Sequence, residues 1–118
     1  VKYGRQRFLT APLMKWMFGK YVSDPAQRGN DLMSPVRASA ERLRGLPATL
    51  IVVAENDILR DEGEAMGRRL DEAGVEVTTV RFNGVVHDWG MLNGFAALHP
   101  TRTLIRLVGS VLRDYLEK

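Results

Sequence analysis

Two residues capable of proton chemistry, Asp57 and His87, follow the two segments with the strongest strand patterns. Thr49–Ala54 is a continuous apolar run, as expected for a parallel strand buried on both faces, and Val75–Phe82 is rich in β-branched residues. Because neighbouring parallel strands end at the same edge of a sheet, we expect Asp57 and His87 to lie close together. An aspartate that orients an imidazole is the acid–base half of a nucleophilic triad, in which histidine takes a proton from an attacking hydroxyl.

Both residues also have structural interpretations. Asp57 comes shortly before a predicted helix, where aspartate commonly caps or turns the chain. A lone histidine is more often a packing or surface residue than a catalyst, but His87 lies in a Gly-rich loop at the predicted catalytic edge. Asp88 is a weaker candidate for the orienting role because it should point away from the same contact. His99, just before the last predicted helix, is expected to be a cap or surface residue.

The segments around the pair predict a parallel βαβα unit and therefore an α/β fold. Asp61–Ala73 is predicted to be a helix, with acids in its first turn, arginines later and Gly74 as its stop. Asn83-Gly84 is predicted to turn the chain after the second strand, and Pro100–Lys118 has the apolar face of an amphipathic helix. The crossover between the strands should be right-handed.

The N-terminal third has a different character. Phe8–Val22 is helix-like, and its apolar residues cover more of the circumference than one buried stripe requires. Asp24 to Pro35 is predicted to be a loop because it contains two prolines, a glycine and an asparagine. Arg37–Arg44 is predicted to form a short helix that ends at Gly45.

Composition bounds the possible functions. The 118 residues and 13.3 kDa fit one domain, and 45% apolar with 26% charged residues is a globular mixture. The absence of cysteine excludes disulfides, thiolate metal sites and cysteine nucleophiles. No apolar run reaches the length of a membrane helix, and the net charge of +3 comes without a nucleic-acid motif. No metal is implied by the scattered carboxylates, and no nucleotide cofactor is implied because no G-x-G-x-x-G follows a strand.

Three motifs carry a family resemblance. They are SPVRA (34–38), GLPATLIVVAENDILRDEGEAMGRRLDEAG (45–74) and NGVVHDWG (83–90). The stretch from Ser34 to Gly90 resembles the C-terminal part of the hormone-sensitive-lipase-like esterases, a branch of the α/β-hydrolase superfamily. The D-x-L-R-D-E-G run is the most specific piece, while Ile58 and Trp89 stand where many members have proline and phenylalanine.

The resemblance implies a carboxylic-ester hydrolase with His87 as the triad base and Asp57 as its orienting acid. It also implies a cap-like helical segment at 1–33 and the C-terminal part of an α/β-hydrolase domain at 34–118. The apolar, Met-rich cap segment suggests a short to medium acyl ester as the small-molecule substrate. The residues expected to contact that substrate are Trp16, Met17, Trp89 and Met91.

The chain departs from the family in lacking its H-G-G-G and G-D-S-A-G-G motifs. None of the four serines, at 23, 34, 39 and 110, is in a G-x-S-x-G context. Nucleophile and oxyanion donors are therefore expected outside this chain, which should be inactive alone. With these motifs absent, the chain resembles the C-terminal piece of a longer enzyme, and its start at Val1 agrees with a missing N-terminus. Such a piece should self-associate or bind the missing N-terminal part. We expect a cytoplasmic location.

Two other interpretations remain open. A βαβα unit with an apolar N-terminal helix could be a non-catalytic dimerising or partner-binding module, which the absent serine motif favours. The D-x-L-R-D-E-G run with a loop histidine 30 residues after Asp57 disfavours it, because a binding module needs no such pair. A receiver-like or flavodoxin-like domain would need about five strands, and only two are convincing.

Overall fold

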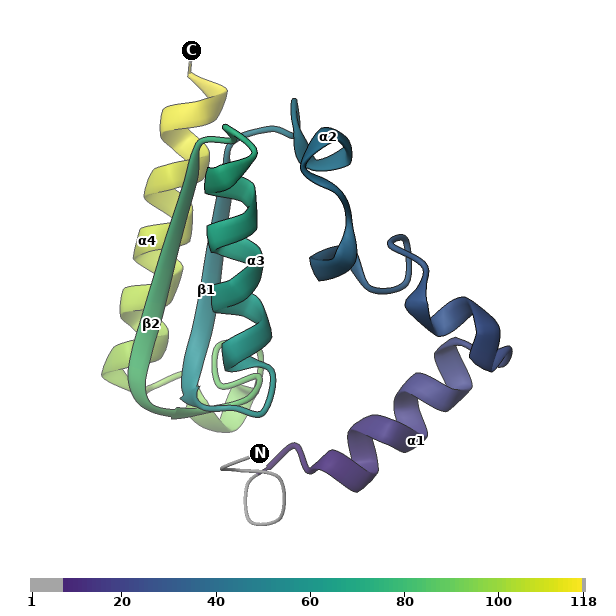
Figure 1. Ribbon diagram of the computed structural model, residues 1–118. Helices are drawn as coiled ribbons and strands as arrows, with labels where there is room; N and C mark the ends of the chain where they lie inside the picture. Colours follow the sequence, from purple (N-terminus) through teal and green to yellow (C-terminus); the bar gives the residue numbers. More distant parts are fainter. Residues whose placement is uncertain (1–7, 118) are drawn as a thin grey trace.

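The computed structural model describes residues 8–117; residues 1–7 of the predicted cap-like segment and Lys118 of the last predicted helix lie outside this range. Its C-terminal half is the predicted βαβα unit, with two parallel strands (Figure 1). The elements in chain order are α1 (Ala11–Tyr21), η1 (Pro25–Gly29), η2 (Pro35–Arg37), α2 (Ala40–Leu43), β1 (Thr49–Asn56), α3 (Arg60–Glu72), β2 (Val77–Val86), η3 (Asn93–Phe95) and α4 (His99–Leu116).

Alternating side chains of β1 divide the interior into two clusters, because successive residues of a strand face opposite sides of the sheet. On one side, Ile51 packs with α2 and α3 against a buried cluster of Ala38, Leu43, Leu70, Ala73 and Val75. On the other side, Val52 and Ala54 pack with Leu104 of α4 in a cluster that includes Phe82, Val85, Trp89 and Phe95. Helices α3 and α4 therefore cover opposite faces of the strand pair (Figure 1). Both faces of β1 carry apolar side chains, as the sequence predicts.

Helix α3 approaches the sheet closely along a glycine face. A Cβ atom added at Gly63 would lie 2.7 Å from Cγ1 of Val53, and one added at Gly67 would collide with the Thr79 side chain. Side chains at these positions would push α3 away from the strands. The spacing of four residues places both glycines on the same face of the helix.

The prediction of a turn at Asn83-Gly84 is wrong, because β2 continues through these residues to Val86. Gly84 has φ +75°, and the strand pairing shifts at this point. Phe82 and Val85 both pack in the α4-side cluster although they are three residues apart, which an unbroken alternation forbids. Asn83 and Gly84 therefore form a β-bulge, a local insertion that keeps the strand going instead of ending it.

The N-terminal elements are shorter than predicted. Thr10 caps α1 by accepting a hydrogen bond from the Leu13 amide at 3.4 Å, so the helix begins after Phe8 and Leu9. Helix α1 has no buried residue and extends away from the βαβα unit (Figure 1).

The segment that connects α1 to the strands also differs from its prediction. The expected loop contains the short helix η1, where the Asp24 side chain accepts from the Ala26 amide at 2.9 Å and Pro25 fixes the first helical position. The expected helix at 37–44 is divided because Ala38 is extended, and only α2 remains, capped by Ser39. In the described part of the chain, no helix has both the length and the apolarity that a membrane crossing requires.

We predict opposite effects of alanine at two helical glycines. Gly67→Ala should lower the free energy of unfolding by about 1–3 kcal/mol, because the added methyl group overpacks the contact with Thr79. Gly109→Ala, on an exposed part of α4 with open space around it, should raise it by about 0.5–1 kcal/mol. Urea unfolding of the two variants measures both changes, and equal effects would contradict the close packing of α3.

Candidate active site

The strand pairing places Asp57 and His87 at the same level of the sheet edge. The last residues of the two strands, Asn56 and Val86, are paired, so the residues that follow them, Asp57 and His87, leave the sheet side by side. Nδ1 of His87 and Oδ2 of Asp57 are 2.7 Å apart, the length of a strong charge-assisted hydrogen bond. The Asp57 side chain is only 10% exposed and that of His87 24%. The two residues expected to meet therefore do so, in a place partly shielded from water.

The two carboxylate oxygens of Asp57 have different partners, one in the turn before α3 and one on His87. Its Oδ1 accepts a hydrogen bond from the Leu59 amide at 2.9 Å, which closes the turn that leads into α3. Its Oδ2 faces Nδ1 of His87. A carboxylate can only accept, so Nδ1 carries the proton of the neutral ring and Nε2 keeps its lone pair. This is the tautomer that a general base of the triad type requires.

Asp88 lies on the other side of the imidazole. Its Oδ1 is 3.4 Å from Nε2 of His87, its side chain is 45% exposed, and its φ of +58° is unusual for a residue other than glycine. The longer distance and greater exposure make it the weaker partner of His87. His99 is exposed as the first residue of α4, which agrees with the expected surface position.

A hollow of about 330 Å³ adjoins the Asp57–His87 pair. Trp89 and Met91, both predicted to contact substrate, contribute to its lining. Trp89 is largely buried, with its ring 5.4 Å from that of Phe82, so it supports the wall from the core side. Met91 is 84% exposed. The rest of the hollow follows β1 from Ile51 to Ala54 and passes between α3 and α4.

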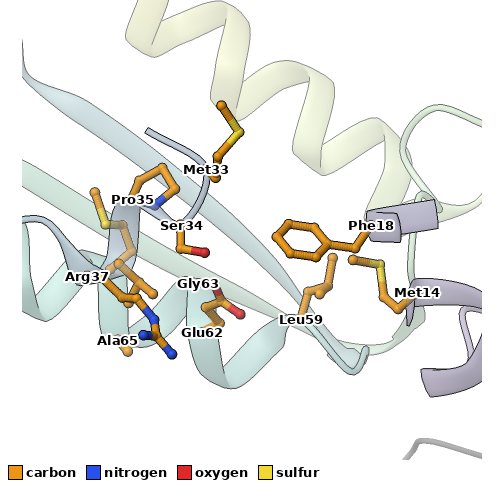
Figure 2. A pocket seen from close by; sticks show the side chains of 12 residues that line it. Met14, Phe18, Met33, Ser34, Pro35, Arg37, Leu59, Glu62, Gly63 and Ala65 are labelled. Atoms are coloured by element: carbon orange, nitrogen blue, oxygen red, sulfur yellow. The ribbon is translucent and has the colours of Figure 1, made fainter. Parts of the chain in front are cut away.

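A second, larger groove of about 810 Å³ lies between α1 and α3. Figure 2 shows Met14 and Phe18 of α1 on one side of it, close to Leu59, with Ser34 and Glu62 farther along. Its wall is mostly apolar, and Met14 and Phe18, one helical turn apart, share the helix face that borders it.

Trp16 and Met17 line neither hollow. Both side chains are exposed, and the Trp16 ring lies 5.9 Å from the Lys20 ammonium. Their contact with substrate stays a prediction. Met14, Phe18 and Leu59 were not predicted from the sequence, and Leu59 borders both hollows. For Leu59 the available signal was its position two residues after Asp57. For α1, apolar residues lie on most sides of the helix and did not indicate which face borders the groove.

The family follows from a comparison with known sequence families. The family model described as alpha/beta hydrolase fold matches residues 1–91, which include both members of the Asp57–His87 pair. The chain belongs to the alpha/beta hydrolase fold family. The resemblance to esterases expected from the motifs is thereby confirmed at the level of this family.

Proteins named as ester hydrolases are among those similar to this chain. The chain is 37% identical over 94 residues to an arylesterase of Saccharolobus solfataricus, and this match covers 80% of the chain and 28% of the arylesterase. It is 36% identical over 88 residues to an ethyl acetate hydrolase of Pseudomonas putida, covering 75% of this chain and 27% of that one.

The same similarity appears among solved structures. A thermostable esterase from Pseudomonas putida superposes with a TM-score of 0.89 at 44% identity, covering 92% of this chain and 34% of the other. The chain therefore spans about a third or less of the length of these relatives.

Two of the four serines make local hydrogen bonds away from His87. The Ser34 hydroxyl donates to the Arg28 carbonyl at 2.9 Å, and the Ser39 hydroxyl caps α2. In residues 8–117, the hydrogen bonds of His87 include no serine, and no three of the His, Asp and Glu side chains gather as a metal site.

We predict that Asp57, and not Asp88, sets the protonation site of His87. In Asp57→Ala the low-field Nδ1 proton should disappear and the neutral ring should populate its other tautomer, because the acceptor at 2.7 Å is gone. In the control Asp88→Ala the Nδ1 proton should persist. Nitrogen-15 NMR of the imidazole measures both, and an unchanged Nδ1 signal in Asp57→Ala would exclude the proposed pair.

Proposed function

We propose that the protein to which this chain belongs hydrolyses carboxylic esters by a Ser-His-Asp mechanism. The observation that carries the proposal is the 2.7 Å contact between Nδ1 of His87 and Oδ2 of Asp57 at the carboxyl edge of two parallel strands. The esterases among the similar proteins support the same reaction class. The chain itself supplies the base and the acid, and the nucleophile and oxyanion donors come from outside it.

The chemistry assigned to this chain is proton transfer. A serine hydroxyl attacks the ester carbonyl while Nε2 of His87 takes its proton, and the resulting imidazolium is stabilised by Asp57. His87 then returns the proton to the leaving alkoxide, which departs as the alcohol. In the second half-reaction water attacks the carbonyl of the acyl-serine while His87 takes its proton. His87 then gives that proton to the leaving serine oxygen, so the carboxylic acid is released and the serine hydroxyl is restored.

The substrate we propose is a small ester with a short to medium acyl chain. The apolar wall formed by Met14, Phe18 and Leu59 offers the ester little beyond packing, and the three methionine side chains in the groove, at 14, 33 and 66, can adapt to different shapes. We assign α1 to a cap over this groove. Two of the similar proteins are named arylesterase and ethyl acetate hydrolase, and these names agree with a small ester as substrate.

Association with another polypeptide is part of the proposal. Within the described residues β1 has β2 as its single neighbour, so its other edge borders the hollow beside the active pair. Large apolar side chains are exposed on α1 and α4, among them Trp16, Tyr21, Ile105 and Leu116. A free apolar strand edge and such patches favour pairing with another chain.

Activity is best tested in a chimera. This chain should replace the corresponding third of the Pseudomonas putida esterase, and hydrolysis of a short p-nitrophenyl ester should be measured. We expect activity in the chimera and none in the 118-residue chain alone. His87→Ala and Asp57→Asn should each lower kcat by about 10³-fold or more. Asp88→Asn should cost less than about tenfold, because Asp57 keeps the imidazole oriented.

His99→Ala is the matched control, since this histidine is exposed and lines neither hollow. Equal losses for Asp57→Asn and Asp88→Asn would contradict the assignment of the acid. Ester hydrolysis by the 118-residue chain alone that disappears in His87→Ala would contradict the claim that the nucleophile lies elsewhere.

A further prediction concerns the self-association of the chain. Light scattering of the purified 118-residue chain should give a mass above 13.3 kDa, because the β1 edge and the patches on α1 and α4 find partners in other copies. A double substitution of exposed residues, Ile105→Lys and Leu116→Lys, should shift the distribution toward smaller species. A monodisperse monomer for the unsubstituted chain would contradict the proposal.

A further inference from the structure

We propose that Glu55 is a positioning residue: its carboxylate holds the β2 bulge that brings His87 to the level of Asp57. The inference deepens the proposed function, on which it rests for its catalytic meaning. Glu55 lies two residues before Asp57 at the end of β1, and nothing in the triad assignment gives it a role.

The strand register shows why the bulge matters. Ala54 is opposite Phe82, but Asn56 is opposite Val86, so β2 uses two more residues than β1 between these pairs. With the register of the earlier part of the strands, Asp57 would be opposite Val85, and His87 would be two residues past the acid. At 3.2–3.4 Å per strand residue, this offset is about 7 Å, too far for a direct hydrogen bond. The contact between Asp57 and His87 therefore depends on the extra length.

Glu55 is bonded to the bulge itself. Its Oε2 accepts a hydrogen bond from the Gly84 amide at 2.8 Å. A bulge leaves backbone groups without their ladder partners, and the exposed Gly84 amide would otherwise bond only to water, which does not fix the shape of the chain. Gly84 has φ +75°, a conformation that glycine adopts without steric cost. The carboxylate thus takes the place of the missing strand acceptor at the residue where the chain departs from regular pairing.

The same residue is anchored at its other end. The Glu55 carbonyl accepts a hydrogen bond from Nη1 of Arg60 at 2.9 Å, and the Arg60 guanidinium also bonds the Asp61 carboxylate. Arg60 is the first residue of α3, so Glu55 connects the start of that helix, the acid loop and the β2 bulge. Through its carboxylate and its backbone carbonyl, Glu55 therefore connects the strand that leads to His87 with the segment that contains Asp57.

The test distinguishes the loss of the hydrogen-bond acceptor at Glu55 from a general loss of stability of the fold. In the full 118-residue chain, Glu55→Gln keeps an oxygen that can accept from the Gly84 amide, and Glu55→Met has similar length without a strong acceptor. Glu64→Gln and Glu64→Met are the matched controls, because Glu64 also connects α3 to β2, by an exposed contact of 3.5 Å with Arg81. The readout is the low-field Nδ1 proton of His87 and its exchange with water.

We expect Glu55→Met to speed exchange of the Nδ1 proton by roughly tenfold or more, the factor for losing one hydrogen bond of ordinary net strength. Glu55→Gln should restore a rate within about threefold of the unsubstituted chain, and both Glu64 variants should leave it unchanged. An unchanged rate in Glu55→Met, or equal acceleration in Glu55→Gln, overturns the proposal.

A measurement on the unsubstituted chain decides the matter if Glu55→Met fails to fold. Hydrogen exchange of the Gly84 amide should be slowed by its bond to Glu55, and an unprotected Gly84 amide overturns the proposal. These readouts require no ester. Failure of the chimera to hydrolyse esters would remove the proposed function while leaving the positioning of His87 by Glu55 intact.

Discussion

The register of two parallel strands is the constraint on which the candidate site depends. Parallel strands present their chemistry at one edge, but regular pairing does not by itself make two chosen residues meet. Here the acid follows β1 at Asn56 and the base follows β2 at Val86, and these two residues are paired only because β2 contains a bulge. The distance of 2.7 Å between Asp57 and His87 is thus a property of the sheet as much as of the loops.

The packing of the helices keeps that sheet edge in place. Two glycines let α3 lie against β1 and β2, and α4 covers the other face through Leu104. Gly90 contributes as well, since a Cβ atom at this position would collide with the Leu104 side chain. The histidine loop therefore passes close under α4, and the buried Thr101 hydroxyl lies 3.5 Å from the Trp89 carbonyl. Close backbone approach on both faces limits how far His87 can move from Asp57.

The sequence predicted the strands, their parallel pairing and the two long helices, because each carries a clear apolar pattern and a helix-stop or proline signal. It also predicted the meeting of Asp57 and His87, which follows from the rule that parallel strands share a carboxyl edge. The bulge was mistaken for a turn since Asn-Gly favours both, and the choice depends on the partner strand. The groove residues Met14 and Phe18 were missed because a helix that is apolar nearly all round does not reveal which face is covered.

The site is divided between parts of unequal burial, and this division has a functional consequence. Asp57 and His87 are held by strand pairing and by helices α3 and α4 packed on the two faces of the strands, whereas one wall of the larger groove belongs to α1, which has no buried residue. Proton transfer needs positions fixed to fractions of an ångström, while an apolar substrate wall needs only contact. If the proposed ester hydrolysis is correct, a loosely packed α1 can serve esters of different shapes without disturbing Asp57 and His87. Changes in α1 would then alter the range of substrates, and the reaction chemistry would depend on the residues that follow the strands.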